Sequence, residues 1–379
     1  MTTRSVSVVL PCLNEADSVG DVVREAAAAL ASAGASGEVL VVDNGSTDSS
    51  AEVARAAGAR VVHERRRGYG AAYLAGFRAA TGDVIVMADA DNTYDLSALP
   101  AFLARIGGGD DLVMGSRFKG HMEAGAMPAL HRFGSPILSG LLNVLYGTGV
   151  DDAHCGMRAF KREALERMQL RMQGMEFASE MIVNAARAGL CIGEVPVNYR
   201  VRAGRSKLHT LRDGWRHLRF LFLYSPTHLF VWPGAVLFTL GVALLVALAP
   251  GPLRIAGYYL DIHFMVLGLL LALVGFQTIA IGLYAKTLAV ALRIQPVDRT
   301  LRALEHAFTL ERGLVVGSVL FLVGLAVDIA VAAEWLSSGL GPLNEVRRAL
   351  IATAAMLLGM QIAFASLFLS AIDLQTRDH

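Results

Sequence analysis

Two aspartates, Asp89 and Asp91, stand one residue apart at the end of an apolar run, Val84–Ala88. The run consists of strand-forming residues bounded by Gly82 and Asn92, which predicts a buried β-strand that ends in Asp-x-Asp. Two carboxylates held this close repel each other, and one would take up a proton unless a cation lay between them. Mg²⁺ or Mn²⁺, which prefer oxygen ligands, would remove the conflict. The alternative interpretation is a surface turn rich in Asp.

Polar residues also follow the two strands predicted nearest the start of the chain. The first run, Val6–Leu10, ends at Pro11 and is followed by Asn14 and Glu15, and the second ends in Asp43. Asp43 could accept hydrogen bonds from a nucleotide base or ribose, although an Asx turn capping the next helix would use the same residue. Because ligands bind outside the carboxyl ends of parallel strands, these residues are expected to line one nucleotide pocket.

Strand and helix alternate four times up to this point, which predicts an α/β fold with a Rossmann-like, mostly parallel sheet and helices on both faces. No GxGxxG follows the first strand and no GxxxxGK[ST] occurs, so dinucleotide and P-loop sites are disfavoured. The apolar segment 127–146 is interpreted as either a helix at a membrane surface or an ordinary core helix. Strands are predicted at Val6–Leu10, Glu38–Val42, Arg60–His63, Val84–Ala88, Leu112–Met114 and, at a sheet edge, Glu194–Tyr199.

After about Arg219 charge becomes sparse and four long apolar runs follow. Each approaches the roughly 20 residues that span a bilayer core. Lys and Arg are dense before the first run and between the second and third, but sparse between the first and second, which predicts a multi-pass protein of the cytoplasmic membrane with the N-terminal domain and both termini in the cytoplasm. The predicted domains are 1–210, an amphipathic juxtamembrane segment 211–228, and 229–379 with helices at about 229–248, 262–284, 314–333 and 349–371.

Overall charge and cysteine content exclude other classes. The formal net charge of the 379-residue chain is +1, which argues against a general nucleic-acid-binding protein. Cys12, Cys155 and Cys191 form no CxxC pair, which is typical of a reducing compartment and a protein without structural zinc. No signal peptide precedes the first predicted strand, so the N-terminal domain is expected in the cytosol.

In their order, the polar motifs resemble those of the family 2 glycosyltransferases, and within them the polyprenyl-phosphate (dolichol-phosphate) sugar synthases. The resemblance covers roughly residues 5–210 and implies a GT-A fold, a nucleotide-sugar donor, a divalent metal and a polyprenyl monophosphate acceptor. The chain departs from the family pattern at His154-Cys155, where Thr-Ser is common, and at Thr93, where Gln or Glu is common. The matching motifs are Pro11-Cys12-Leu13-Asn14-Glu15, Asp43-Asn44-Gly45-Ser46-Thr47-Asp48, Gly68-Tyr69-Gly70, Asp89-Ala90-Asp91, Gly115-Ser116-Arg117, Asp152-Ala153-His154-Cys155-Gly156-Met157-Arg158 and Arg202-Ala203-Gly204-Arg205-Ser206-Lys207.

The resemblance implies a role for each motif. Asp89 and Asp91 would hold the metal and the diphosphate and act in catalysis, and Asp152 would be the base if one is needed. A phosphate monoester, with a second pKa of about 6, is already largely ionised at neutral pH, so Asp152 could instead orient the acceptor or Arg158. The nucleotide-sugar pocket would contain Pro11, Asn14, Glu15, Asp43, Gly70 and Asp89.

The acceptor phosphate would be bound by Arg117, Arg202, Ser206 and Lys207. Guanidinium groups pair with phosphate oxygens through two parallel hydrogen bonds, which suits this role. The basic segment 200–219 also precedes the first apolar run, so attraction to anionic lipid headgroups is the alternative, and both roles are compatible.

The leading hypothesis is therefore inverting transfer of a hexose from a UDP-Glc-type or GDP-Man donor to polyprenyl phosphate at the cytoplasmic membrane face. A glycosyltransferase that acts on a glycolipid or polysaccharide is one alternative, although the Gln-x-x-Arg-Trp motif of processive synthases is absent from the sequence. A non-catalytic membrane protein with a nucleotide-sugar-binding domain is the other, and the Asp89/Asp91 pair disfavours it. The expected partners are the donor, the lipid acceptor and the bilayer, without nucleic acid; a homo-oligomer is compatible with the sequence.

Overall fold

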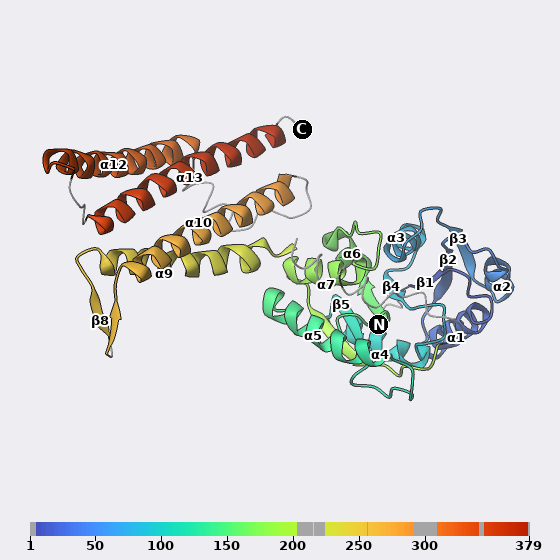
Figure 1. Ribbon diagram of the computed structural model, residues 1–379. Coiled ribbons are helices and arrows are strands. Elements are labelled where there is room, and N and C mark those ends of the chain that lie inside the picture. Colours follow the sequence, from blue (N-terminus) through green and yellow to red (C-terminus); the bar gives the residue numbers. More distant parts are fainter. Residues whose placement is uncertain are drawn as a thin grey trace. The chain divides into compact units, whose positions relative to one another are not determined.

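The computed structural model describes residues 5–202, 215, 224–255, 257–291, 309–340 and 345–377. The chain forms two compact units, Met1–Leu221 and Phe222–His379. The first contains a large β-sheet and the second contains the long apolar helices (Figure 1).

The first unit is built on a seven-stranded sheet in the order β3-β2-β1-β4-β6-β5-β7. Neighbouring strands are parallel except at β6, which is antiparallel to both β4 and β5. All six predicted strands are present, and Ile192–Pro196 lies at an edge as expected; β6 was not predicted because its four residues begin and end with a charged side chain. The strands are β1 (Val6–Cys12), β2 (Gly37–Asp43), β3 (Arg60–His63), β4 (Val84–Met87), β5 (Leu112–Ser116), β6 (Arg158–Lys161) and β7 (Ile192–Pro196).

Helices cover both faces of this sheet, which confirms the predicted α/β architecture (Figure 1). On one face Val8 belongs to a core cluster that includes side chains of α1 and α4. On the other face α3 packs so closely that a Cβ atom on Gly76 would lie 2.4 Å from the side chain of Val9. The helices of this unit are α1 (Val19–Ser32), α2 (Ser50–Ala56), α3 (Tyr69–Ala79), a 3₁₀ turn (Leu96–Ala98), α4 (Leu99–Gly107), α5 (Ala129–Tyr146), α6 (Arg162–Met168) and α7 (Phe177–Arg187).

The strand order brings the predicted polar clusters together at the carboxyl ends of neighbouring strands. β1 lies between β2 and β4, and its last residue, Cys12, pairs with Asp43. On its other side β1 is in register with β4, so that Val9 pairs with Met87. Asp43, at the end of β2, and the segments after β1 and β4, which carry Asn14 and Asp89, are therefore side by side.

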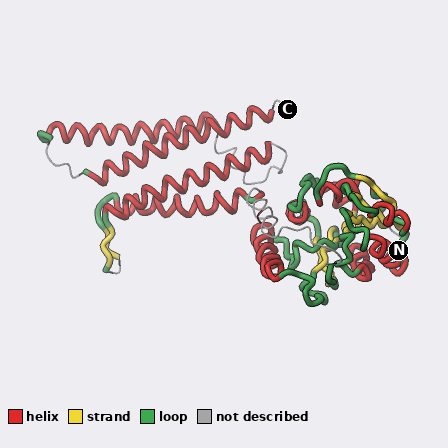
Figure 2. Tube along the Cα trace, turned by 45° about the vertical axis from the view of Figure 1, so that its right-hand side comes forward, coloured by secondary structure: helices red, strands yellow, loops and turns green. Residues whose placement is uncertain are grey.

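In the described part of the second unit, four long helices run alongside one another (Figures 1 and 2). Among the described residues, four helical segments are long and apolar enough to cross a membrane: Thr227–Leu248, Ile262–Ala291, Leu310–Ser337 and Val346–Ile372. They contain the four predicted runs, and each extends beyond its run at one end or both. The elements are a π-helical turn (Thr227–Val231), α9 (Trp232–Leu248), the hairpin β8 (Leu253–Ile255) and β9 (Tyr258–Leu260), α10 (Ile262–Ala291), α12 (Leu310–Ser337) and α13 (Val346–Arg377).

Glycines allow these apolar helices to approach closely. A Cβ atom on Gly241 of α9 would lie 2.3 Å from the backbone nitrogen of Ala272 in α10, and one on Gly359 of α13 would lie 2.5 Å from the carbonyl oxygen of Gly317 in α12. Small residues at helix crossings are typical of membrane bundles, where packing contacts replace the hydrophobic driving force. The second unit is thus packed as a membrane domain.

Candidate active site

Asp89 lies just beyond β4 and is held by two tyrosines of α3. Its Oδ1 accepts hydrogen bonds from the hydroxyl of Tyr69 at 3.2 Å and, more weakly, from that of Tyr73 at 3.4 Å. Burial raises the pKa of Asp89 to about 7, with a second contribution from the neighbouring charge of Asp91. The electrostatic conflict inferred from the sequence is therefore present in the folded protein.

Asp91 is buried and has a different set of contacts. Its Oδ1 accepts hydrogen bonds from the backbone N–H of Thr93 at 3.2 Å and from the Thr93 hydroxyl at 2.6 Å. Asn92 has a φ of 62°, which turns the chain sharply between them. Thr93, the departure from the family pattern, thus orients the Asp91 carboxylate through two hydrogen bonds to Oδ1. The other carboxylate oxygen of Asp91 lies 3.3 Å from Nη1 of Arg202.

The donor set of this site fits a divalent cation. Two buried carboxylates with an electrostatic conflict are stabilised by a cation, and Mg²⁺ commonly takes one or two carboxylates and completes its shell with substrate phosphates and water. Within the described residues no cluster of three or more His, Cys, Asp or Glu side chains is placed to hold a metal. Asp89 and Asp91 would hold the cation, and phosphate and water oxygens would complete its coordination.

Residues predicted to bind the nucleotide are brought together around the turns that follow β1 and β2. Asn14, at a φ of 51°, accepts a hydrogen bond from Thr47 N–H on Oδ1 at 2.7 Å. The Oδ1 of Asp43 accepts one from Ser46 N–H at 3.0 Å, and its Oδ2 lies 3.0 Å from Nδ1 of His63. Burial opposes ionisation of Asp43, but these hydrogen bonds outweigh it and lower the pKa of its carboxyl. Asp43 therefore forms the expected turn and also remains a charged acceptor at this edge.

Pro11, Glu15 and Gly70 have distinct surroundings. Pro11 is part of β1 and pairs with Val42, while the backbone N–H of Glu15 donates to the hydroxyl of Ser50 at 2.9 Å. Gly70 lies in the first turn of α3, where a Cβ atom would come within 2.2 Å of the carbonyl oxygen of Met172. The structure shows that Gly70 permits close packing of two segments; its contact with a nucleotide-sugar remains a prediction.

On the predicted acceptor side, Arg117 and Asp152 form a buried ion pair. Nε and Nη2 of Arg117 donate to the two carboxylate oxygens at 2.7 and 2.8 Å, and the backbone N–H of Arg117 donates to Oδ2 at 3.1 Å. The guanidinium also lies 5.3 Å from the ring centroid of Tyr199. Both predicted residues are thus in direct contact with each other.

Arg158, the sequence-based alternative partner of Asp152, is held by backbone carbonyls instead. Its guanidinium donates to the carbonyl oxygens of Cys155, Ala178 and Ala153 at 2.9, 2.9 and 3.1 Å. The side chain is 1% exposed, so this buried cation is stabilised by peptide dipoles within the core. Arg158 fixes the segment that follows Asp152 without contacting its carboxylate in the described hydrogen bonds.

Arg202 links the predicted donor and acceptor residues. Its Nη2 donates to Oε1 of Glu15 at 2.7 Å, and its Nη1 lies 3.3 Å from Asp91. The guanidinium therefore lies next to the proposed cation ligand. The other two acceptor-phosphate candidates, Ser206 and Lys207, lie outside the described residues.

Three residues that shape the site were given no role from the sequence: Tyr69 and Gly156, which lie within matching motifs, and Tyr73, which lies in none. Tyr69, the middle residue of Gly68-Tyr69-Gly70, and Tyr73 are four residues apart, which places them on one helix face, and this spacing was a usable signal. A Cβ atom on Gly156 would lie 2.7 Å from Oδ2 of Asp89. Its importance depends on the approach of β6 to β4, and that antiparallel pairing gives no local signal in the sequence.

The chain is similar to known glycosyltransferases. Residues 7–169 match the model of glycosyl transferase family 2, and residues 283–373 match the C-terminal transmembrane region of family 2 glycosyltransferases. The low-salt glycan biosynthesis hexosyltransferase of Haloferax volcanii is 41% identical over 370 residues, which cover 97% of this chain and 89% of that protein. A dolichyl-phosphate hexose transferase of the same organism is 36% identical over 213 residues, 56% of this chain and 90% of that protein.

A solved structure is also similar to part of the chain. It is the glucosyl-3-phosphoglycerate synthase of Mycobacterium tuberculosis in complex with Mn²⁺, UDP and glucosyl-3-phosphoglycerate, with 25% identity and a TM-score of 0.47 over 59% of this chain and 80% of that chain. The two family matches and the Haloferax relatives define a glycosyltransferase with a membrane region. The chain belongs to glycosyltransferase family 2, which confirms the predicted family.

Proposed function

We propose that this glycosyltransferase transfers a hexose from a nucleotide-sugar to a polyprenyl phosphate at the cytoplasmic face of the membrane, with inversion at the anomeric carbon. One Haloferax relative is named as a dolichyl-phosphate hexose transferase, which supports a lipid phosphate as acceptor. The bias of Lys and Arg among the connections between apolar runs supports the cytoplasmic orientation.

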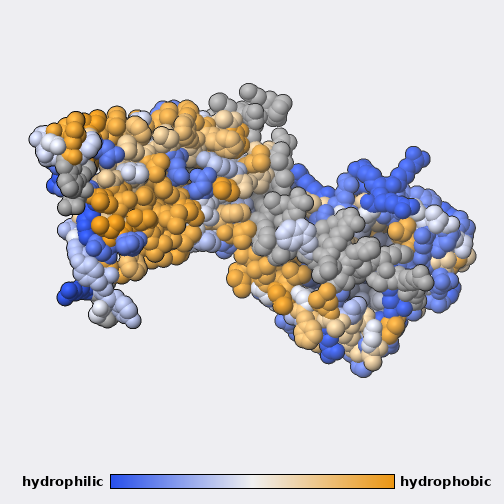
Figure 3. Space-filling view, in the orientation of Figure 1, coloured by the Kyte–Doolittle hydropathy of each residue, from blue (hydrophilic) through white to orange (hydrophobic). Residues whose placement is uncertain are grey.

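The observation that carries the lipid acceptor is the two-sided character of α5. Four large apolar side chains on this helix are between 55% and 80% exposed, whereas the small polar side chains of Ser135 and Ser139 are buried together with Leu142. Figure 3 shows apolar surface over α5 on the visible face of the first unit. In a water-soluble domain this arrangement would be reversed, so the outer face of α5 fits the boundary of a bilayer. The exposed side chains are Leu130, Phe133, Ile137 and Val144.

The inner face of α5 is connected to the predicted acceptor residues. Asn143 donates to Val150 O at 2.9 Å and accepts from Val150 N–H at 3.1 Å, and the hydroxyl of Ser139 accepts from Ala153 N–H at 3.0 Å. These bonds fix both ends of the segment that carries Asp152. The helix whose outer face fits lipid thus positions the ion pair between Arg117 and Asp152.

The proposed reaction follows from these placements. Asp43 and Asn14 bind the nucleotide. Asp89 and Asp91 would hold a divalent cation, which would supply positive charge next to the departing nucleoside diphosphate. An ionised acceptor oxygen forms the new bond to the anomeric carbon while the bond to the diphosphate breaks on the opposite face. Because the acceptor phosphate is ionised at neutral pH, no proton passes to the protein, and Asp152 orients Arg117 toward the phosphate.

Purified full-length protein in detergent and lipid provides the test. Radiolabelled UDP-Glc, UDP-GlcNAc, UDP-Gal and GDP-Man are offered with undecaprenyl or dolichyl phosphate, and separate reactions contain glycolipid or polysaccharide acceptors. We expect one donor to yield a lipid-phosphate sugar of inverted anomeric configuration, which NMR of the product resolves. Transfer only to a glycolipid or polysaccharide, or failure with every lipid phosphate, would contradict the proposal.

A further inference from the structure

The orientation of the Asp89 carboxylate is set from two sides. The Tyr69 and Tyr73 hydroxyls donate to Oδ1, and Oδ2 faces Gly156, where a Cβ atom would be only 2.7 Å away. Tyr73 also donates to Ala88 O at 3.1 Å, a shorter contact than its 3.4 Å distance to Asp89. Tyr69 is therefore the principal side-chain donor to this carboxylate among the described hydrogen bonds.

Tyr69 is held by a separate segment, residues 171–173. Gly68, at a φ of 153°, and Gly70 flank the tyrosine, and a Cβ atom on either would lie 2.2 Å from a carbonyl oxygen of Gln173 or Met172. The N–H of Ala71 donates to Gln173 O at 3.1 Å. The start of α3 thus lies directly against this segment, and the glycines on both sides of Tyr69 make that approach sterically possible.

Segment 171–173 is in turn fixed by Glu180 in the first turn of α7. The two carboxylate oxygens accept hydrogen bonds from the N–H groups of Arg171 and Met172, both at 2.9 Å. Glu180 is 1% exposed, and a buried carboxylate is stable only where such donors satisfy it. The same helix contributes Phe177, whose ring packs edge-on to Tyr69 at a centroid distance of 6.4 Å.

We propose that Tyr69 is a positioning residue that orients Asp89 for a divalent cation, and that Glu180 fixes Tyr69 through segment 171–173. The inference rests on the proposed cation role of Asp89. A hydrogen bond to one oxygen of a ligating carboxylate fixes its rotation and directs the other oxygen, and loss of such outer-shell partners typically lowers metal affinity about 10–100-fold. The contacts that connect Glu180 to Asp89 through segment 171–173 and Tyr69 provide a functional explanation for the burial of Glu180.

The test measures Mn²⁺ binding directly. Full-length wild-type protein and the variants Tyr69→Phe, Tyr73→Phe and Glu180→Gln are titrated with Mn²⁺, with and without UDP, and free Mn²⁺ is followed by electron paramagnetic resonance. We expect Tyr69→Phe to raise the Kd by about 10–100-fold and Tyr73→Phe to raise it less. Glu180→Gln keeps the shape but replaces one acceptor oxygen by an amide donor, so it should raise the Kd as well. Saturating Mn²⁺ should restore much of the transfer rate of Tyr69→Phe.

The outcomes separate this inference from the proposed function. If wild-type protein binds no Mn²⁺, the cation role of Asp89 is wrong, and the positioning role is wrong with it. If wild-type protein binds Mn²⁺ and Tyr69→Phe binds it with the same Kd, only the positioning role is wrong. A Glu180→Gln variant that has a lower Tm but an unchanged Kd would show that Glu180 stabilises the fold without acting on the site.

Discussion

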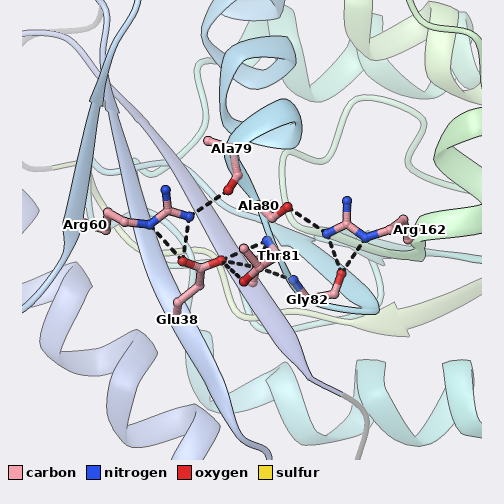
Figure 4. A network of polar contacts seen from close by, with 8 residues as sticks. Glu38, Arg60, Ala79, Ala80, Thr81, Gly82 and Arg162 are labelled. Carbon is pink, nitrogen blue, oxygen red and sulfur yellow. Dashed lines mark hydrogen bonds and ion pairs between the residues drawn. The ribbon is translucent and has the colours of Figure 1, made fainter.

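A carboxylate lies at each end of the central sheet, and the surroundings shift the pKa values of the two in opposite directions. At the amino end of β2, Oε1 of Glu38 accepts hydrogen bonds from Ser7 and Thr81, while Oε2 accepts two from Arg60, the closer at 2.7 Å (Figure 4). Burial opposes ionisation of Glu38, but these donors outweigh it and lower its pKa to about 2. At the carboxyl end, burial and the proximity of Asp91 raise the pKa of Asp89 to about 7.

The difference lies in the donors that the protein supplies. Around Glu38 the network continues to Arg162, whose guanidinium donates to the carbonyl oxygens of Ala80 and Gly82, so the amino end is completed by the chain itself (Figure 4). Around Asp89, two tyrosine hydroxyls share one oxygen. A perturbed carboxylate at a strand end is typical of a functional site, where a ligand supplies the missing stabilisation. We therefore expect the amino end to serve stability and the carboxyl end to serve binding.

The largest expected effect comes from removing a carboxylate at the carboxyl end. Asp91→Asn should reduce sugar transfer at least about a hundredfold and weaken Mn²⁺ binding, because a cation ligand and its charge are lost together. Asp21→Asn, which alters an exposed ion pair on α1, is the matched control and should leave transfer unchanged. Radiolabel transfer and Mn²⁺ titration measure both effects. Full activity of Asp91→Asn would remove the cation site from the mechanism.

The ion pair between Arg117 and Asp152 comes next. Leaving one member of a buried pair without its partner typically costs about 3–5 kcal/mol, so Asp152→Asn should lower the Tm by at least about 5 °C. The double variant Arg117→Met with Asp152→Asn should lose less stability than the two single variants together, but should bind polyprenyl phosphate poorly. Thermal unfolding and the KM for the acceptor test this. An unchanged KM in the double variant would show that the pair has a structural role alone.

Arg202 provides a third test, because its guanidinium competes with a cation for Asp91. Arg202→Ala should tighten Mn²⁺ binding in the absence of donor by up to about tenfold, which corresponds to about 1.4 kcal/mol. The same variant should raise the KM for polyprenyl phosphate. Arg24→Ala is the matched control, since Arg24 pairs with Asp21 in an exposed ion pair of α1 and should leave Mn²⁺ binding unchanged. Weaker Mn²⁺ binding in Arg202→Ala would contradict the competition.

The sequence predicted the parallel strands, the four apolar helices and the convergence of Asp43, Asp89 and Asn14, because strand periodicity, apolar length and the strand-end rule are local signals. It did not predict β6 or the approach of Gly156 to Asp89, which depend on a strand that returns from far along the chain. The sequence also left Arg158 as a possible partner of Asp152, whereas the structure pairs Asp152 with Arg117. Both arginines carry the same charge, and only the fold shows that Arg158 donates its hydrogen bonds to carbonyl oxygens.

The smallest effect on activity is expected at the amino end of the sheet. The pKa of Glu38 is about 2 in the folded protein and 4.5 ordinarily, so its stabilising contribution is complete above pH 4.5 and is lost as the pH falls toward 2. Glu38→Gln should lower the Tm at pH 7 by about 2–4 °C, for a network worth about 1 kcal/mol, and leave transfer within about twofold of wild type. Thermal unfolding from pH 7 to pH 3 should show the gap in Tm narrowing. If the difference in Tm between wild type and Glu38→Gln stayed constant with pH, the charge of Glu38 would not contribute to stability. The contrast with Asp89 would then have no electrostatic basis.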